Sequence, residues 1–172
     1  MKIYTIGHST HAIGEFIDIL KAHHIEQVVD VRTIAKSRHN PQFGEQTLAV
    51  SLAEQQLKYL RLEKLGGLRP TMKDSINKAW RNKSFRGYAD YMQTSEFTEG
   101  LHELIQLAKN GTTTIMCAEA VPWRCHRSLI GDALLLRDIE VIDIMNHKST
   151  KPHTLTSFAV VDGLSLTYPE TA

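Results

Sequence analysis

The chain has 172 residues, a length typical of one domain with a full hydrophobic core. Apolar residues make up 42% of it and charged residues 23%, which is ordinary globular composition and argues against disorder. The formal net charge of +1 gives no overall field that would draw the protein to nucleic acid or an anionic membrane. We therefore expect residues 1–172 to form a single domain in which any anion binding depends on local clusters of charge.

The segment MKIYTIGHST has an apolar run too short for a signal peptide, and no later run approaches the ~20 apolar residues of a membrane span. The two cysteines, Cys117 and Cys125, are too few for a disulfide framework. These features predict a cytoplasmic protein without membrane contact.

The first thirty residues predict a parallel strand–helix–strand unit. Residues 2–6 alternate in the manner of a strand, and apolar residues recur at helical spacing over residues 13–20. Residues 28–31 then read as a short buried strand. Two residues are placed to cap the helix, Ser9 and Thr10.

The alternation continues through the middle and the end of the chain. After a polar loop, the expected elements are a helix at 46–55, a strand at 59–62, an irregular stretch at 63–82, a helix around Tyr88, a helix capped near Thr94 or Ser95, a strand at 112–116, a helix around Leu129 and a strand at 140–145. Asp162-Gly163 is a two-residue turn signal between the strands of a C-terminal hairpin at about 158–168.

This order predicts an α/β fold with three layers: a mostly parallel sheet, helices on both of its faces and the C-terminal β-hairpin. Ligands of such folds bind beyond the carboxyl ends of the strands. The polar segments 7–10, 30–38 and 117–127 follow three of the predicted strands, so we expect them to meet in one site.

Arginine is concentrated in segments that could face this edge. Six of the nine arginines lie there: Arg32, Arg38, Arg69, Arg86, Arg124 and Arg127. The planar guanidinium binds phosphate or carboxylate through two hydrogen bonds, which favours a pocket for an anionic ligand. The alternative is that these arginines pair with acidic residues and brace the loops. Other candidate ligand-binding residues are Ser9, Thr10, Ser37, Asn40, Trp123 and His126.

His8, Asp30 and Glu119 are the candidates for acid–base chemistry. His8 ends the first strand and has an ordinary pKa near neutrality, although it could also serve only as a hydrogen-bonding loop residue. Asp30 and Arg32 are two positions apart, so their side chains should share one face, and Glu119 follows Cys117 in the same way. Either carboxylate could instead orient an arginine.

Two readings are open for the cysteines. Cys117 ends a strand, where a cysteine is usually part of the core. Cys125 should begin a helix beside Arg124, His126 and Arg127, which would favour a reactive thiolate, or it is inert. The spacing C-x7-C-H matches no common zinc motif, and we expect neither a metal nor a cofactor. The fingerprints of dinucleotide, P-loop and nucleophile-elbow proteins are missing from the sequence.

Six segments of the chain are distinctive: IYTIGHST at 3–10, VVDVR at 28–32, SRHNPQF at 37–43, LGGLR at 65–69, FRGYADYMQT at 85–94 and MCAEAVPWRCHRSLI at 116–130. Through these segments the chain resembles the family of the domain of unknown function DUF488. The resemblance implies an α/β fold with clustered polar loops and carries no activity. A looser resemblance, at the level of the fold, is to rhodanese-type domains, which pair a DVR after a strand with a cysteine loop before a helix.

Three hypotheses of function follow. The first is an enzyme, a hydrolase or transferase, that acts on an anionic, phosphate-bearing or nucleotide-like molecule. The second is a thiol-dependent enzyme that uses Cys125. The third is a non-catalytic module that binds nucleic acid or a protein partner through its arginines. The sequence does not define an oligomeric state.

Overall fold

The structure is a computed structural model that describes residues 1–171. It confirms the predicted α/β fold, in which five parallel strands and an antiparallel edge strand form one sheet in the order β3-β2-β4-β1-β5-β6. The strands are β1 (Lys2–Gly7), β2 (Gln27–Asp30), β3 (Lys58–Arg61), β4 (Thr113–Cys117), β5 (Glu140–Ile144) and β6 (Thr150–Pro152).

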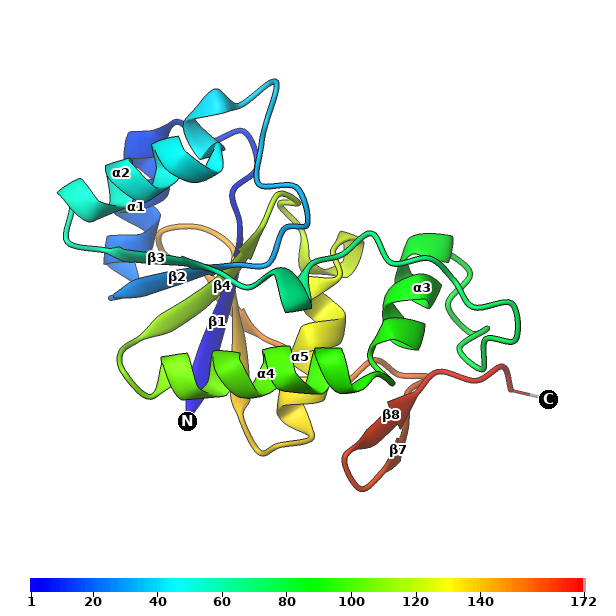
Figure 1. Ribbon diagram of the computed structural model, residues 1–172. Coiled ribbons are helices and arrows are strands. Elements are labelled where there is room, and N and C mark those ends of the chain that lie inside the picture. The colour runs from blue at the N-terminus through cyan, green and yellow to red at the C-terminus, as the bar shows by residue number, and fades with distance from the viewer. Residues whose placement is uncertain (172) are drawn as a thin grey trace.

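Helices cover both faces of the sheet (Figure 1). On one face lie α1 (Ile13–Ala22) and α2 (Glu45–Glu54), whose buried side chains, such as Phe16 and Leu48, pack with Met116 of the sheet. On the other lie α3 (Lys83–Tyr91), α4 (Ser95–Ala108) and α5 (Arg127–Leu135), which pack with Ile115. Every residue of β2 and β4 is buried, as expected for central strands covered on both faces.

The strand order places a switch point between β1 and β4. These two strands are neighbours, but the chain leaves β1 toward β2 on one side and leaves β4 toward β5 on the other. The two connections pass over opposite faces, through α1 and α5. A crevice therefore opens at the carboxyl ends of β1 and β4, the place where open α/β sheets bind ligands.

Two local features differ from the expectations, and a third agrees with them. The first residue before α1 is Ala12, and no side chain caps the helix, so the prediction that Ser9 or Thr10 caps it is wrong. The edge strand β6 was not predicted; it is short and polar and ends in Pro152, which an edge strand tolerates because one side needs no ladder hydrogen bonds. Thr94 caps α4 as expected, accepting a hydrogen bond from the backbone N–H of Phe97.

The C-terminal hairpin, β7 (Val160–Asp162) and β8 (Ser165–Thr167), forms as predicted and projects from the body of the molecule beside α3 and α5 (Figure 1). Its turn is one residue later than expected, because Asp162 pairs with Ser165 and leaves Gly163-Leu164 as the loop. Gly163 has a φ of 62°, and the first position of such a turn favours glycine for this reason.

Candidate functional site

A pocket of about 530 Å³ opens at the carboxyl ends of β1, β2 and β4, at the switch point. Residues from each of the polar segments 7–10, 30–38 and 117–127 line it, so the structure brings the three segments together as expected. The predicted site residues in its lining are His8, Ser9, Thr10, Arg32, Ser37, Asn40, Glu119, Arg124, Cys125 and His126. Sequence reasoning missed several others, among them Lys36, Gly67, Leu68 and Cys117.

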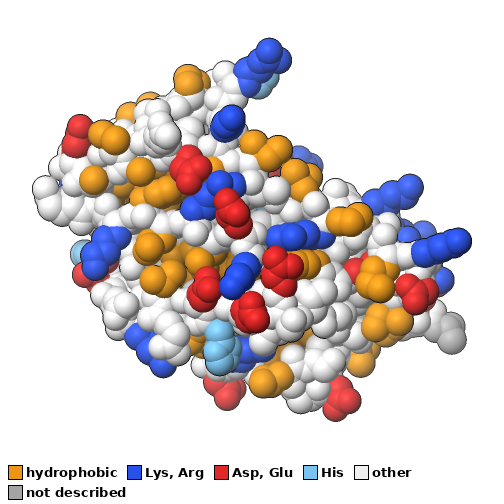
Figure 2. Space-filling view, viewed as in Figure 1, with side chains coloured by type: hydrophobic (Ala, Val, Ile, Leu, Met, Phe, Trp, Pro, Cys, Tyr) orange, Lys and Arg blue, Asp and Glu red, His pale blue; other side chains and the backbone are white. Residues whose placement is uncertain are grey.

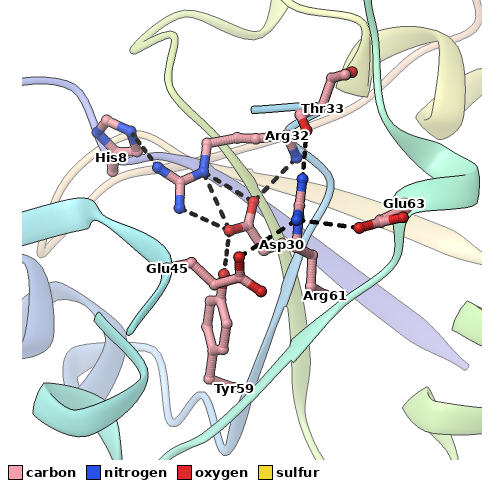
Figure 3. Close-up of polar contacts among 8 residues, drawn as sticks. All are labelled: His8, Asp30, Arg32, Thr33, Glu45, Tyr59, Arg61 and Glu63. Carbon is pink, nitrogen blue, oxygen red and sulfur yellow. Dashed lines mark hydrogen bonds and ion pairs between the residues drawn. The ribbon is translucent and has the colours of Figure 1, made fainter. Parts of the chain in front are cut away.

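The floor of the pocket on the β2 side is a buried network that runs from Asp30 through Arg32 to His8 (Figure 3). Nη2 of Arg32 donates to Oδ2 of Asp30 at 2.7 Å, and its Nε donates to Oδ1 at 3.0 Å. The hydroxyl of Tyr59 donates to Oδ2 as well. Asp30 is fully buried, so its carboxylate orients Arg32 and is not available to a ligand.

His8 is held at the other end of this network. Nη1 of Arg32 donates to Nε2 of His8 at 3.4 Å, so Nδ1 carries the ring proton and donates to the carbonyl of Ser9 at 2.8 Å. The ring is stacked on Phe43, with 4.2 Å between the centroids. Burial lowers the pKa of His8, and the positive charge of Arg32 lowers it further. His8 is therefore a neutral imidazole whose two nitrogens are both engaged.

The loops that follow β1 and β4 are in direct contact. The backbone N–H groups of His8 and Ser9 donate to the carbonyls of Cys117 and Ala118, each at 2.9 Å. A Cβ on Gly7 would lie 1.6 Å from the carbonyl oxygen of Glu119, so only glycine permits this approach. Ser9 has a φ of 49°, a conformation that a non-glycine residue adopts at a cost. This wall of the pocket is closely fixed.

Arg127, a predicted ligand-binding residue, lies beneath the loop after β4 and does not line the pocket. Its side chain is fully buried, and Nη1 lies 2.7 Å from Sγ of Cys117. The same nitrogen donates to the carbonyl of Glu119, and Nη2 donates to that of Ala120 at 3.2 Å. Arg127 therefore braces the loop and places its charge against a thiol.

The order of acidity of the two thiols is the reverse of the expectation, which gave the reactive thiolate to Cys125 and placed Cys117 in the core. Burial alone would raise the pKa of Cys117, but a hydrogen bond with Cys125 and the charge and hydrogen bond of Arg127 lower it to about 7. Burial raises the pKa of Cys125 well above its usual value, and the neighbouring Cys117 raises it further. Cys125 also precedes α5, which begins at Arg127, and does not lie in its first turn. The residue expected to be core thus carries the more acidic thiol.

Two charged side chains of the loop after β4 form no ion pair among the described residues. Glu119 and Arg124 are both exposed, line the pocket, and form no ion pair with any other residue in the range 1–171. Lys36, in the segment after β2, also lines the pocket and is likewise without an ion pair among the described residues. These three are the charged side chains of the lining that have no ion partner among residues 1–171.

The remaining predicted residues lie elsewhere. Arg38 is exposed and does not line the pocket. Arg69 donates to the carbonyls of Gly66 and Glu63 and lies over the ring of Tyr91, while Arg86 donates to the carbonyl of Trp80. The contacts of Arg69 and Arg86 therefore agree with the alternative prediction, in which the arginines brace loops. Trp123 is 59% exposed and lines a second, smaller cavity of about 270 Å³.

His126 lies between the pocket and the core. Its Nε2 is 2.8 Å from the carbonyl oxygen of Val31, and its ring packs against Tyr88. Burial lowers the pKa of His126 to about 4, although the hydrogen bonds to backbone carbonyls oppose this. His126 is therefore a neutral residue that joins the loop before α5 to the end of β2.

Charges of both signs are interspersed on the face shown in Figure 2. Among the ion pairs of the described residues, Arg61 pairs with Glu45 and Glu63, and Lys64 pairs with two glutamates of α4. This face therefore has no single-sign patch of the kind that binds nucleic acid. Within residues 1–171, no three His, Cys, Asp or Glu side chains are grouped to hold a metal ion. No helix of this part is long and apolar enough to cross a membrane.

Comparison with known proteins places the chain in a family without assigning a reaction. No curated protein matches it, and no solved structure matches it. The family model of the domain of unknown function DUF488 matches residues 12–134, which is well over half of the chain and includes most of the pocket lining. The chain therefore belongs to the DUF488 family.

Proposed function

We propose that this protein is an enzyme that binds an anionic, phosphate-bearing small molecule in the pocket at the ends of β1 and β4. The observation that carries the proposal is that Arg124 and Lys36 line this pocket without an ion partner among residues 1–171, whereas the charge of Arg32 is matched by Asp30. Two unmatched cations in the lining of one pocket would attract an anion to it.

The backbone of the loop after β4 supports the same ligand. The N–H groups of Ala118 and Ala120 donate to no other group in residues 1–171, and both residues line the pocket. Free backbone N–H groups in a loop of this kind are common partners of phosphate oxygens. A phosphate there would receive hydrogen bonds from the backbone and charge from Arg124.

The rest of the pocket suits an organic group. Ile34 and Leu68 are 60% and 69% exposed on its rim, and Phe85 lies beside them in the lining. A nucleoside or another apolar body attached to the phosphate would cover these side chains. This supports a phosphorylated organic molecule rather than a free inorganic anion as the substrate.

Glu119 is the residue that we propose for proton transfer. Asp30 is fully buried and paired, and both nitrogens of His8 are engaged, so neither is free to exchange a proton with a ligand. Glu119 has an exposed carboxylate at the pocket. Proton transfer to a leaving group or from water by such a carboxylate is ordinary general acid–base chemistry.

Calorimetric titration with inorganic phosphate tests the binding site. Arg124→Ala and Lys36→Ala should each weaken phosphate binding by about tenfold, the effect of losing one charge-assisted contact. Arg38→Ala is the matched control, because Arg38 is exposed in the same region and lies outside the lining. Equal affinity in all four proteins, or no binding at constant ionic strength, would contradict the proposal.

A further inference from the structure

We infer that Cys117 is the nucleophile of this pocket and that it attacks the phosphorus atom of the bound phosphate ester. The inference rests on the proposed function for the identity of the electrophile. It assigns a role to a residue whose sequence position is typical of the core, and it replaces Cys125 as the candidate reactive thiol.

The position of Cys117 carries the first part of the inference. It is the last residue of β4, at the switch point, and its side chain lines the pocket between the loop of Glu119 and the segment of His8. A nucleophile at the end of a central strand is held rigidly, because the strand on each side fixes its backbone. The free N–H groups of Ala118 and Ala120 lie in the loop that follows it.

The contacts of Sγ carry the second part. Nη1 of Arg127 lies 2.7 Å away, and that arginine is fully buried, so its charge is little screened by water. A buried guanidinium at this distance from a sulfur stabilises a thiolate rather than a thiol.

The pKa shifts agree with this geometry. Although burial opposes ionisation, Cys125, Arg127 and the backbone at Glu119 bring the pKa of Cys117 to about 7. About half of the protein would then hold a thiolate at neutral pH, whereas an ordinary cysteine is only a few per cent ionised. The other titratable or charged groups of the pocket around Cys117 are His8, Arg32, Lys36, Glu119, Arg124 and His126.

The reaction balances without an oxidant or a cofactor. The Cys117 thiolate forms an Sγ–P bond while the P–O bond to the organic group breaks, and the leaving oxygen takes a proton delivered by Glu119. Water then attacks phosphorus as Glu119 accepts its proton, the Sγ–P bond breaks, and the thiolate is restored. The products are the alcohol and inorganic phosphate.

Alkylation with iodoacetamide over a range of pH, followed by peptide mass spectrometry, tests the inference on the full chain. Cys117 should be modified with a midpoint near pH 7 and, at pH 7, about tenfold faster than an ordinary cysteine. Cys125 should remain unmodified in this range. Inorganic phosphate should slow the modification of Cys117, because it would occupy the space in front of Sγ.

Three variants separate the explanations. Cys117→Ser should abolish the fast modification, and Cys125→Ser should retain it with a somewhat higher midpoint. Arg127→Met should raise the midpoint of modification. Arg127→Lys keeps the positive charge and should raise this midpoint less, and it serves as the second variant if Arg127→Met does not fold. Suppose that phosphate binds but Cys117 is not alkylated by iodoacetamide, or is alkylated with the pH dependence of a free cysteine. That result overturns the inference and leaves the proposed function standing. Fast modification that phosphate does not slow supports the thiolate and contradicts the proposed anion site.

Discussion

Nη1 of Arg127 lies 2.7 Å from Sγ of Cys117, and both residues are buried at the end of β4. The same guanidinium holds the carbonyls of Glu119 and Ala120, so one side chain fixes the shape of the loop and the charge next to the thiol. Structure and chemistry at this site therefore depend on the same residue.

Arg127→Met should reduce the free energy of unfolding by about 3 kcal/mol, because two part-buried carbonyls lose the donor that holds the loop in place. Urea denaturation measures this. Arg38→Met is the control, and it should change the stability by less than about 0.5 kcal/mol because Arg38 is exposed. Equal stability of the two variants would show that Arg127 does not brace the loop.

Gly7→Ala should destabilise the fold by at least about 3 kcal/mol, since the new Cβ would meet the backbone of Glu119 and the loop after β4 would have to shift. Gly14→Ala offers a contrast, because nothing lies within 4 Å of a Cβ there. In the helix α1 it should be neutral or stabilise by about 0.5 kcal/mol. Thermal unfolding distinguishes the two, and a harmless Gly7→Ala would refute the close contact of the loops.

Acid should destabilise the protein through His126. The pKa of its buried ring is lowered to about 4, so the unfolded chain binds a proton below about pH 6.5 that the folded chain does not bind until about pH 4. The stability contributed by the neutral ring is thus present above pH 6.5 and is lost as the pH falls toward 4, by up to about 3 kcal/mol. Urea denaturation of His126→Gln should show a weaker dependence on pH in this window; an unchanged dependence would contradict the assignment.

Asp30→Asn should cost about 3 kcal/mol of stability, because it leaves the buried charge of Arg32 without a counter-charge. Tyr59→Phe removes only one hydrogen bond to the same carboxylate and should cost about 1 kcal/mol. The order of the two effects, measured by denaturation, is the informative result. A larger loss in Tyr59→Phe would mean that the ion pair is not the main contact of Asp30.

Glu119→Gln should bind inorganic phosphate at least as tightly as the unmodified protein, because it removes a like charge from the pocket. Calorimetry measures the affinity, with Glu54→Gln as a control at an exposed position outside the lining. Weaker binding in Glu119→Gln would place this carboxylate among the ligand contacts rather than in proton transfer.

The sequence predicted the layers of the fold because strands and helices alternate with clear periodicity, and it predicted that Asp30 and Arg32 share a face from their spacing. It could not predict the roles of the cysteines. The turn over Pro122–Arg124 directs Cys125 inward and brings Arg127 under the loop, and neither follows from local pattern. Leu68 was missed because it is distant in sequence from the ends of β1 and β4, and Lys36 lies inside the predicted segment 30–38 but was not named because the cations predicted for the site were all arginines.

Because Gly7 and Glu119 are in close contact, one side of the pocket tolerates amino-acid substitutions less well than the other. The side that holds Cys117 is formed by neighbouring strands and backbone contacts, so substitutions there alter the fold itself. The side that holds Ile34, Lys36 and Leu68 consists of exposed side chains on loops, which tolerate exchange. A protein built in this way can acquire a new substrate through its loops while its reactive centre stays the same.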